Sequence, residues 1–224
     1  MSVSPDLLRF LTDLKSNNSR EWFAANKSMY DEEKRKFDML IESLIVQYGS
    51  FENMVGVERK HCSYRIYRDV RFSKNKEPYK TWFSASFSEG GRRSGYMDYY
   101  LHIEPGGKSF LGGGMYSPTP EQLAKYRQEV DYNGVALRKI VESADFVRVF
   151  GKAEGEMLQK VPKGYDPAGD DVDYIRRKQL FYWRHYSDEE IVSSDFVSKL
   201  MQDSKLLKPF LDFLNLTFFD KEPF

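Results

Sequence analysis

The amino-acid sequence predicts an α+β protein, with a mainly antiparallel sheet in the middle of the chain flanked by N- and C-terminal helices. Apolar residues recur at helical spacing near both ends of the chain, and they alternate with a period of two between about residues 64 and 116. The 224 residues show no internal repeat, linker or break in composition. We therefore expect one domain over 1–224: a helical segment at 4–49, a sheet-rich core at 58–118, and a helical part at 119–216 with one added strand near 180–186.

The N-terminal segment carries two helix start signals. Ser4-Pro5-Asp6 combines a capping residue, a proline and an acidic residue in the first turn, and leucines then follow at helical spacing. Asn18 with Glu21 resembles a capping box for a second helix that ends near Gly49.

The middle third is predicted to form strands at 64–72, 81–87 and 96–104, because apolar and polar residues alternate in each of them. A further strand is expected at 110–116 as the hairpin partner of the strand at 96–104. Pro105-Gly106-Gly107 is typical of the turn between the last two strands. Each strand is expected to bury one face only, which is common in antiparallel sheets.

The C-terminal part starts with a capping signal at Thr119, and a further helix is expected at 135–150. Prolines and glycines at 161–171 predict a loop, and Leu180–Tyr186 reads as a short aromatic strand. Asp195 is expected to cap a terminal helix, which Pro209 would bend or split.

The overall charge argues against a general polyanion binder, because 34 basic residues match 34 acidic ones. Charge is nevertheless uneven: residues 58–93 hold ten Lys and Arg against four Asp and Glu, and residues 166–195 hold four against eight. These segments could pair within the fold. A single cysteine, no apolar run long enough to span a membrane and no signal peptide predict a cytoplasmic protein. The sequence indicates no oligomeric state.

The segment from Arg65 to Lys80 is the first candidate for a binding site, because it carries six cations against two acids. On a strand, Arg65, Asp69 and Arg71 would share the polar face. Arg68 would point to the apolar side and need a buried partner. The alternative is an ion-pair network with a solvated loop.

A second candidate is the polar and aromatic face of the strand at 96–104. His102 and Glu104 are expected on one face with roughly 7 Å between their Cα atoms, together with Tyr96, Asp98 and Tyr100. This pair could supply a general base with an orienting carboxylate, or two ligands of a metal site for which no third ligand is evident. The alternative is a helix packed over this face.

Other motifs predict no cofactor and no metal. Gly107-Lys108-Ser109 lacks the earlier glycine of a phosphate-binding P-loop, since His102 stands in its place. Cys62, beside His61, is expected in the core.

The pattern Arg65-x-x-Arg68-Asp69-x-Arg71-Phe72, followed by Asn75-Lys76-x-x-Tyr79, resembles the signature of the family catalogued as domain of unknown function 2461. Asn17-Asn18-x-Arg20-x-Trp22-Phe23 and His102-x-Glu104-Pro105-Gly106 are similar to further parts of its pattern. The resemblance covers essentially the whole chain. It implies a single-domain cytoplasmic protein of bacterial type, and it assigns no reaction and no catalytic residues.

These observations lead to three hypotheses. The first is a site on the sheet for a small phosphate- or carboxylate-bearing ligand, with hydrolysis or transfer as a further option. The second is a protein-interaction or scaffold module whose Arg and Asp motif is a structural ion-pair network, and the third and weakest is nucleic-acid binding. The candidate ligand-binding residues are Arg65, Arg68, Asp69, Arg71, Lys76, Tyr79, Lys80, Tyr100, His102 and Glu104.

Overall fold

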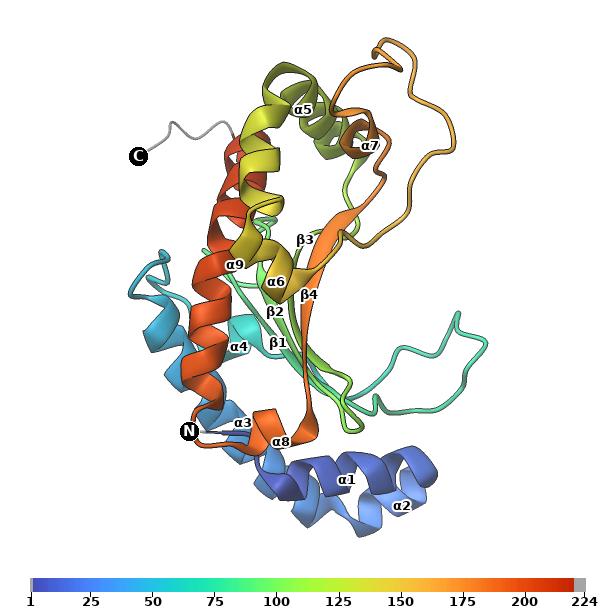
Figure 1. Ribbon diagram of the computed structural model, residues 1–224. Helices are drawn as coiled ribbons and strands as arrows, with labels where there is room; N and C mark the ends of the chain where they lie inside the picture. The colour runs from blue at the N-terminus through green and yellow to red at the C-terminus, as the bar shows by residue number, and fades with distance from the viewer. Residues whose placement is uncertain (1, 220–224) are drawn as a thin grey trace. The chain divides into compact units, whose positions relative to one another are not determined.

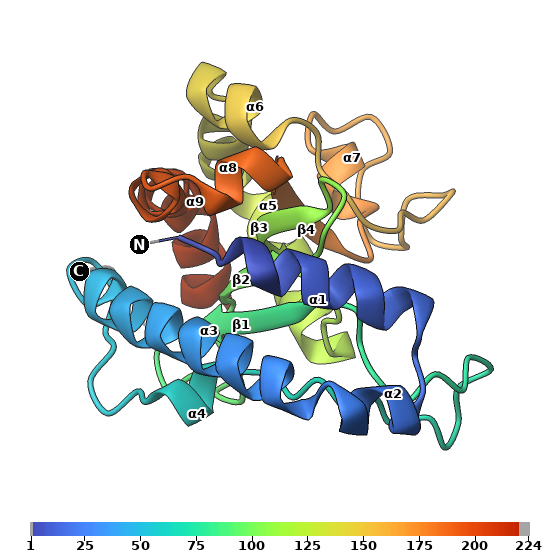
Figure 2. The same cartoon turned by 90° about the horizontal axis from the view of Figure 1, so that it is seen from below.

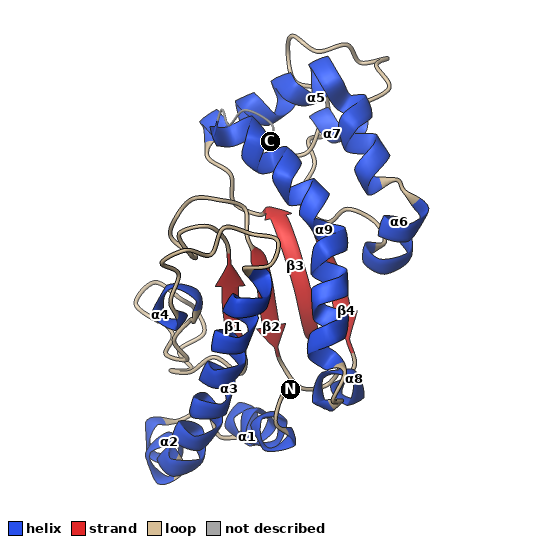
Figure 3. Cartoon of the chain, turned by 90° about the vertical axis from the view of Figure 1, so that its left-hand side faces the viewer, coloured by secondary structure: helices blue, strands red, loops and turns tan. Residues whose placement is uncertain are grey.

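The computed structural model describes residues 2–219 and confirms the α+β class. Four strands form an antiparallel sheet in the order β1-β2-β3-β4, and helices precede and follow the first three strands in the chain (Figure 3). The strands are β1 (Phe83–Phe87), β2 (Tyr99–Ile103), β3 (Ser109–Met115) and β4 (Leu180–Tyr186). The helices are α1 (Pro5–Ser16), α2 (Arg20–Ala25), α3 (Lys27–Tyr48), α4 (Arg59–Cys62), α5 (Pro120–Val141), α6 (Ala144–Phe150), α7 (Val172–Ile175), α8 (Asp188–Val192) and α9 (Phe196–Phe219), as labelled in Figure 1.

The chain divides into two compact units, each assembled from three segments. Unit 1 comprises residues 1–95, 99–111 and 185–202, and unit 2 comprises 96–98, 112–184 and 203–224. Strands β3 and β4 and helix α9 each contribute residues to both units. The expectation of one domain stays a prediction.

Unit 1 is built around α1, α3 and the pair β1–β2. Figure 2 shows α1 beside α3, and their leucine stripes are fully buried. The register pairs Ala85 with Leu101 on the face toward α3, while Ser84 lies opposite His102 and Ser86 opposite Tyr100 on the other face. The period of two therefore leaves a polar and aromatic face on this part of the sheet.

Unit 2 has its own aromatic core. Tyr182 packs edge-to-face on Phe146 and Phe210, with ring centroids 4.9 and 5.1 Å away. Gly114 has φ +127°, and a Cβ there would lie 2.5 Å from the carbonyl oxygen of Leu180, so glycine allows the close approach of β3 to β4.

The predicted second helix is divided. It forms α2 and α3, which meet at Asn26, and Ser19 rather than Asn18 caps α2 by accepting a hydrogen bond from the Trp22 N–H. The Asn18 side chain instead pairs with both backbone polar groups of Tyr79, at 3.0 and 3.1 Å. The capping prediction at Asn18 is therefore wrong by one residue.

The predicted strand at 64–72 is wrong. Tyr67 makes an isolated bridge with Tyr79, and the chain between them turns back on itself instead of extending along the sheet. The Asp69 carboxylate accepts the backbone N–H of Arg71, and this local bond competes with strand pairing. A loop therefore stands where the alternation predicted a strand.

The remaining boundaries shift by less. Strand β2 starts at Tyr99, so Tyr96 and Asp98 lie outside it. The expected helix at 135–150 forms the end of α5 and then α6, and α5 itself is kinked at Asn133. Helix α9 begins directly after Asp195 and continues through Pro209, which does not split it.

Candidate functional site

A pocket of about 620 Å³ in unit 1 is lined mainly by cations. Its walls come from the start of α3, from α4, from the segment after α4, from Lys80 and from the turn that follows β1. Within the described residues 2–219, no acidic side chain lines it. The lining residues are Tyr30, Lys34, Arg59, Lys60, Ser63, Tyr64, Arg65, Tyr67, Lys80, Arg92 and Arg93, and we call this the cationic pocket.

Backbone hydrogen bonds hold the walls of the cationic pocket in place. The Tyr64 N–H donates to the carbonyl of Ser84 in β1 at 3.1 Å, and the Lys80 N–H donates to the carbonyl of Ile66 at 2.8 Å. Arg65 and Lys80 are thus fixed beside the edge strand β1.

Gly91 brings Arg92 to the same pocket. Gly91 has φ +77°, and a Cβ at this position would lie 2.7 Å from the carbonyl oxygen of His61. The same carbonyl accepts the Arg92 N–H at 3.0 Å. Only glycine allows both this left-handed turn and this close approach, so the turn after β1 returns Arg92 to the end of α4.

The pocket cations fall into two groups by their partners. Lys34 and Arg59 both pair with Asp38, and Lys60 pairs with Glu58 at 3.0 Å. Over residues 2–219, no acidic side chain forms an ion pair with the remaining four cations, and the buried Nε of one of them has no hydrogen-bond partner. These four are Arg65, Lys80, Arg92 and Arg93, with the unsatisfied Nε on Arg92.

The pKa of Lys80 responds to this uncompensated positive charge. Its pKa is lowered from the usual 10.5, first by burial and then by repulsion from Arg65 and Arg92. The Lys80 ammonium and the Arg92 guanidinium both lie against the ring of Tyr64, 5.5 and 5.2 Å from its centroid. The aromatic ring offsets part of the repulsion, and an anion would offset more of it.

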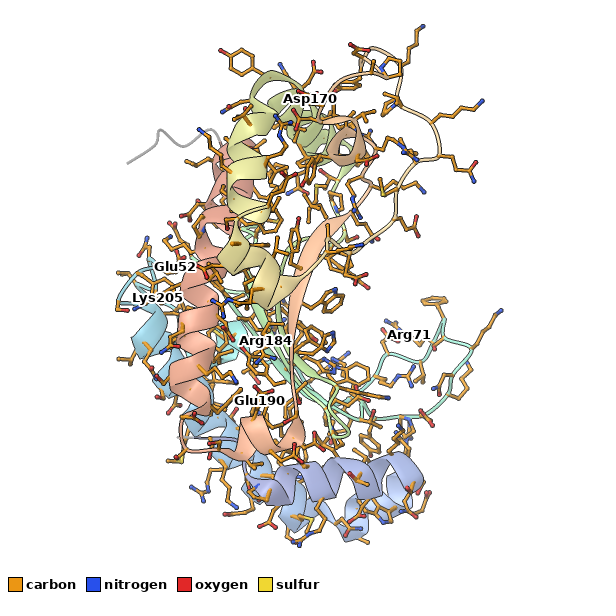
Figure 4. All side chains as sticks on the ribbon, viewed as in Figure 1. Glu52, Arg71, Asp170, Arg184, Glu190 and Lys205 are labelled. Carbon is orange, nitrogen blue, oxygen red and sulfur yellow. The ribbon has the colours of Figure 1, made fainter. Side chains whose placement is uncertain are left out.

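The two arginines of the loop at 68–78 are each paired with an acidic residue of the same loop. Arg71 forms a bidentate pair with Asp69, at 2.9 and 2.7 Å, and this pair lowers the pKa of Asp69 to about 2. Arg68 reaches Glu77 at 3.4 Å, and the Lys76 ammonium donates to the Val70 carbonyl. Figure 4 labels Arg71 on this loop. The structure therefore does not bring these candidates to the cationic pocket.

Tyr79 lies in the core. It is 6% exposed and stacks on Phe23 with ring centroids 4.0 Å apart, and burial raises its pKa. Its contacts are those of a residue that anchors the base of the loop to α2.

Tyr100, His102 and Glu104 come together on the polar and aromatic face of β2. His102 Nε2 lies 3.0 Å from Glu104 Oε2, and the Tyr100 hydroxyl lies 3.4 Å from His102 Nδ1. The His102 ring stacks between Trp82 and Phe110, at centroid distances of 5.4 and 4.7 Å. This face adjoins the cationic pocket through Tyr64, whose ring packs edge-to-face on Tyr100 at 5.9 Å.

A family model described as "Conserved hypothetical protein (DUF2461)" matches residues 6–213 of the chain. The chain belongs to the DUF2461 family. No match was found among curated proteins or among solved structures.

In this DUF2461 protein, the sequence-based candidates missed part of the cationic pocket. Arg92 and Arg93 follow β1 and lie outside the signature, but both fall inside the basic region of residues 58–93. The charge count was the available signal. The double glycine before Arg92 could have indicated the sharp turn that returns both arginines to the pocket.

Among residues 2–219 of this DUF2461 protein, no group of three or more His, Cys, Asp or Glu side chains could hold a metal ion. The backbone N–H groups of Gly106 and Gly107 already bind the carboxylate of Asp188, at 2.8 to 3.1 Å. No helix within these residues is long and apolar enough to cross a membrane.

Proposed function

We propose that the cationic pocket binds a small molecule that carries a phosphate or carboxylate group. The observation that carries this proposal is the set of four cations, Arg65, Lys80, Arg92 and Arg93, that line one pocket without acidic partners. Lys80 and Arg92 are half-buried, and half-buried positive charge is costly unless an opposite charge approaches it; Arg65 and Arg93 add exposed charge at the same pocket. The double charge of a phosphate group matches several cations better than the single charge of a carboxylate does.

Thermal unfolding with added anions tests this proposal. We expect inorganic phosphate and sulfate to raise the melting temperature of the wild-type protein, because a ligand that binds only the folded state stabilises it by about 2.7 kcal/mol at 100 times its dissociation constant. Arg65→Gln should abolish most of the shift, since Arg65 is exposed and its loss leaves the core intact.

Lys74→Gln is the matched control, because Lys74 is an exposed cation of the loop at 68–78 and does not line the pocket. It removes the same charge and should keep the full shift. Equal shifts in the two variants would indicate nonspecific ionic stabilisation, and no shift with any anion would contradict the proposal.

A second candidate function is protein interaction, and the loop at 68–78 favours it. Its charges are paired locally as Arg68–Glu77 and Asp69–Arg71, and Phe72 near its tip is 96% exposed. This function predicts that Phe72→Ser leaves stability and anion binding unchanged and weakens capture of a protein partner. Nucleic-acid binding is a third and weaker candidate, and it predicts affinity that falls steeply with salt.

We also propose a cellular compartment and a type of source organism for the protein. Cys62 is the only cysteine of the sequence and is buried, so an intrachain disulfide is impossible, which fits a reducing compartment such as the cytoplasm. A bacterial source follows from the family resemblance alone.

A further inference from the structure

Tyr100, His102 and Glu104 form a chain of three polar groups that matches the order of a nucleophile, a base and an orienting carboxylate. The Tyr100 hydroxyl, the two ring nitrogens of His102 and Glu104 Oε2 follow one another at 3.4 and 3.0 Å. In this arrangement the imidazole can take the proton of the hydroxyl group, and the carboxylate stabilises the charged imidazole that results.

The hydrogen bonds define which nitrogen of His102 carries the proton. The Glu104 carboxylate can only accept, so Nε2 must donate to it. In the neutral ring Nδ1 then has a free lone pair, which accepts the hydroxyl proton of Tyr100. The ring is thus oriented to act as a base toward Tyr100.

The His102 ring is also held against rotation. Trp82 and Phe110 stack on its two faces with interplanar angles of 28° and 11°. Glu104 is fixed in turn, because its backbone N–H donates to the Ser109 hydroxyl at 3.1 Å. Such positioning by packed neighbours is what a proton-transfer site requires.

The charged and titratable groups that face His102 keep it neutral. Burial lowers the pKa of His102 from 6.5, and electrostatic interaction with His185 and Lys80 lowers it further, whereas Glu104 acts in the opposite direction. The Tyr100 hydroxyl also faces the ring of His102. At neutral pH the imidazole is therefore available to accept a proton.

We propose that the Tyr100 hydroxyl is a nucleophile, activated by His102 and Glu104, that attacks a phosphate monoester held by the cationic pocket. This inference rests on the proposed function. Tyr64 connects the two parts, since its ring contacts Tyr100 on one side and carries Lys80 and Arg92 against its π system. Lys80 and Arg92 would stabilise the negative charge on the phosphoryl oxygens.

The step conserves atoms and charge. The Tyr100 oxygen forms a bond to phosphorus, the bond from phosphorus to the ester oxygen breaks, and the tyrosine proton passes to His102 Nδ1 and then to the departing oxygen. Water then attacks the phosphotyrosine, its proton moves through His102 to the Tyr100 oxygen, and inorganic phosphate leaves.

Labelling with para-fluorosulfonylbenzoate tests this inference without knowledge of the natural substrate. The probe carries a carboxylate for the cations and a sulfonyl fluoride that an activated tyrosine oxygen attacks, with loss of fluoride and transfer of the proton to His102. Tyr132 is 89% exposed and serves as the unactivated reference in the same peptide map. We expect Tyr100 to react at least about tenfold faster than Tyr132.

Three further results are expected. His102→Gln should reduce the Tyr100 rate to that of Tyr132, Glu104→Gln should reduce it in part, and phosphate should protect Tyr100. The wild-type rate should fall only at pH values below 6.5, as the pH passes through the lowered pKa of His102, because the protonated ring no longer accepts the tyrosine proton. Circular dichroism checks that each variant is folded, and Glu104→Gln remains informative if His102→Gln is not, because Glu104 is only half-buried.

The outcomes separate the inference from the proposed function. A phosphate-induced rise in melting temperature together with a Tyr100 that reacts no faster than Tyr132 would overturn the nucleophile and leave anion binding intact. Fast labelling of Tyr100 that no anion alters would support the activated tyrosine and contradict its link to the pocket. Unchanged labelling in a folded His102→Gln or Glu104→Gln variant would overturn the relay.

Discussion

Lys80 is the residue whose titration should report an anion in the cationic pocket. Its pKa is lowered by burial and by Arg65 and Arg92, so its charged form is disfavoured in the free protein. A bound anion favours the charged form and raises this pKa. The affinity for the anion must therefore fall as pH rises through the lowered pKa of the free protein.

Sulfate is the suitable probe, since its own charge is constant over this range. We predict that its affinity is constant near neutral pH and declines at alkaline pH values still below 10.5, the usual pKa of lysine. Lys80→Arg should remove this decline, because guanidinium stays charged. Isothermal titration calorimetry measures the sulfate affinity of both proteins across this pH range. A decline of equal size in Lys80→Arg would show that Lys80 does not cause it.

The sequence predicted which types of residue form the site better than it predicted which individual residues belong to it. Arg65 and Lys80 lie in the pocket, and Tyr100, His102 and Glu104 share one face as their spacing predicted. Asp69 and Arg71 satisfy each other two residues apart, which a count of charges cannot distinguish from a surface open to ligands.

The element with the clearest structural requirement is the turn after β1. Gly91 combines a positive φ with contact to His61, whereas Gly106 has φ +86° and no neighbouring atom within 4 Å of an added Cβ. Alanine at either position meets the left-handed strain of about 1–2 kcal/mol. Only at Gly91 does it also collide with backbone.

We predict that Gly91→Ala destabilises the protein by about 1–3 kcal/mol more than Gly106→Ala, because the collision adds an overpacking cost. It should also weaken sulfate binding, since the turn holds Arg92 in the pocket. Urea unfolding and sulfate titration of both variants measure these effects. Equal stabilities would mean that the turn relaxes without cost.

The helices and strands also show where prediction from sequence ends. The alternation of apolar and polar residues located β1 and β2, whose pairs alternate between Ala85–Leu101 on one face and Ser84–His102 on the other. The expectation that each strand buries one face only is wrong for β1, because all five of its residues are buried. The same alternation at 64–72 led to a wrong strand prediction, because Asp69 forms a local turn. Ile66 and Arg68 make their backbone hydrogen bonds with Lys80 and Pro78 at the other end of the same loop. Whether an alternating segment becomes a strand depends on pairing with residues far away in the sequence, and a single sequence does not reveal that pairing.

At the scale of the whole molecule, the expectation of one domain has a thermodynamic consequence. Strands β3 and β4 and helix α9 each supply residues to both compact units, so neither unit is a continuous stretch of chain. We predict one cooperative transition on heating. Far-ultraviolet circular dichroism and tyrosine absorbance should give coincident curves, and two separate transitions would contradict the prediction.

The division of unit 1 among three segments also bears on how the protein is made. Its last segment, residues 185–202, comes late in the chain and includes α8, with Asp188 binding the turn at Gly106 and Gly107. A nascent chain that leaves the ribosome from its N-terminus must therefore keep this unit incomplete until residues 185–202 have been added. Premature termination before Leu180 would release a chain that lacks β4 and leaves β3 as an exposed sheet edge, which makes it a substrate for chaperones and proteases.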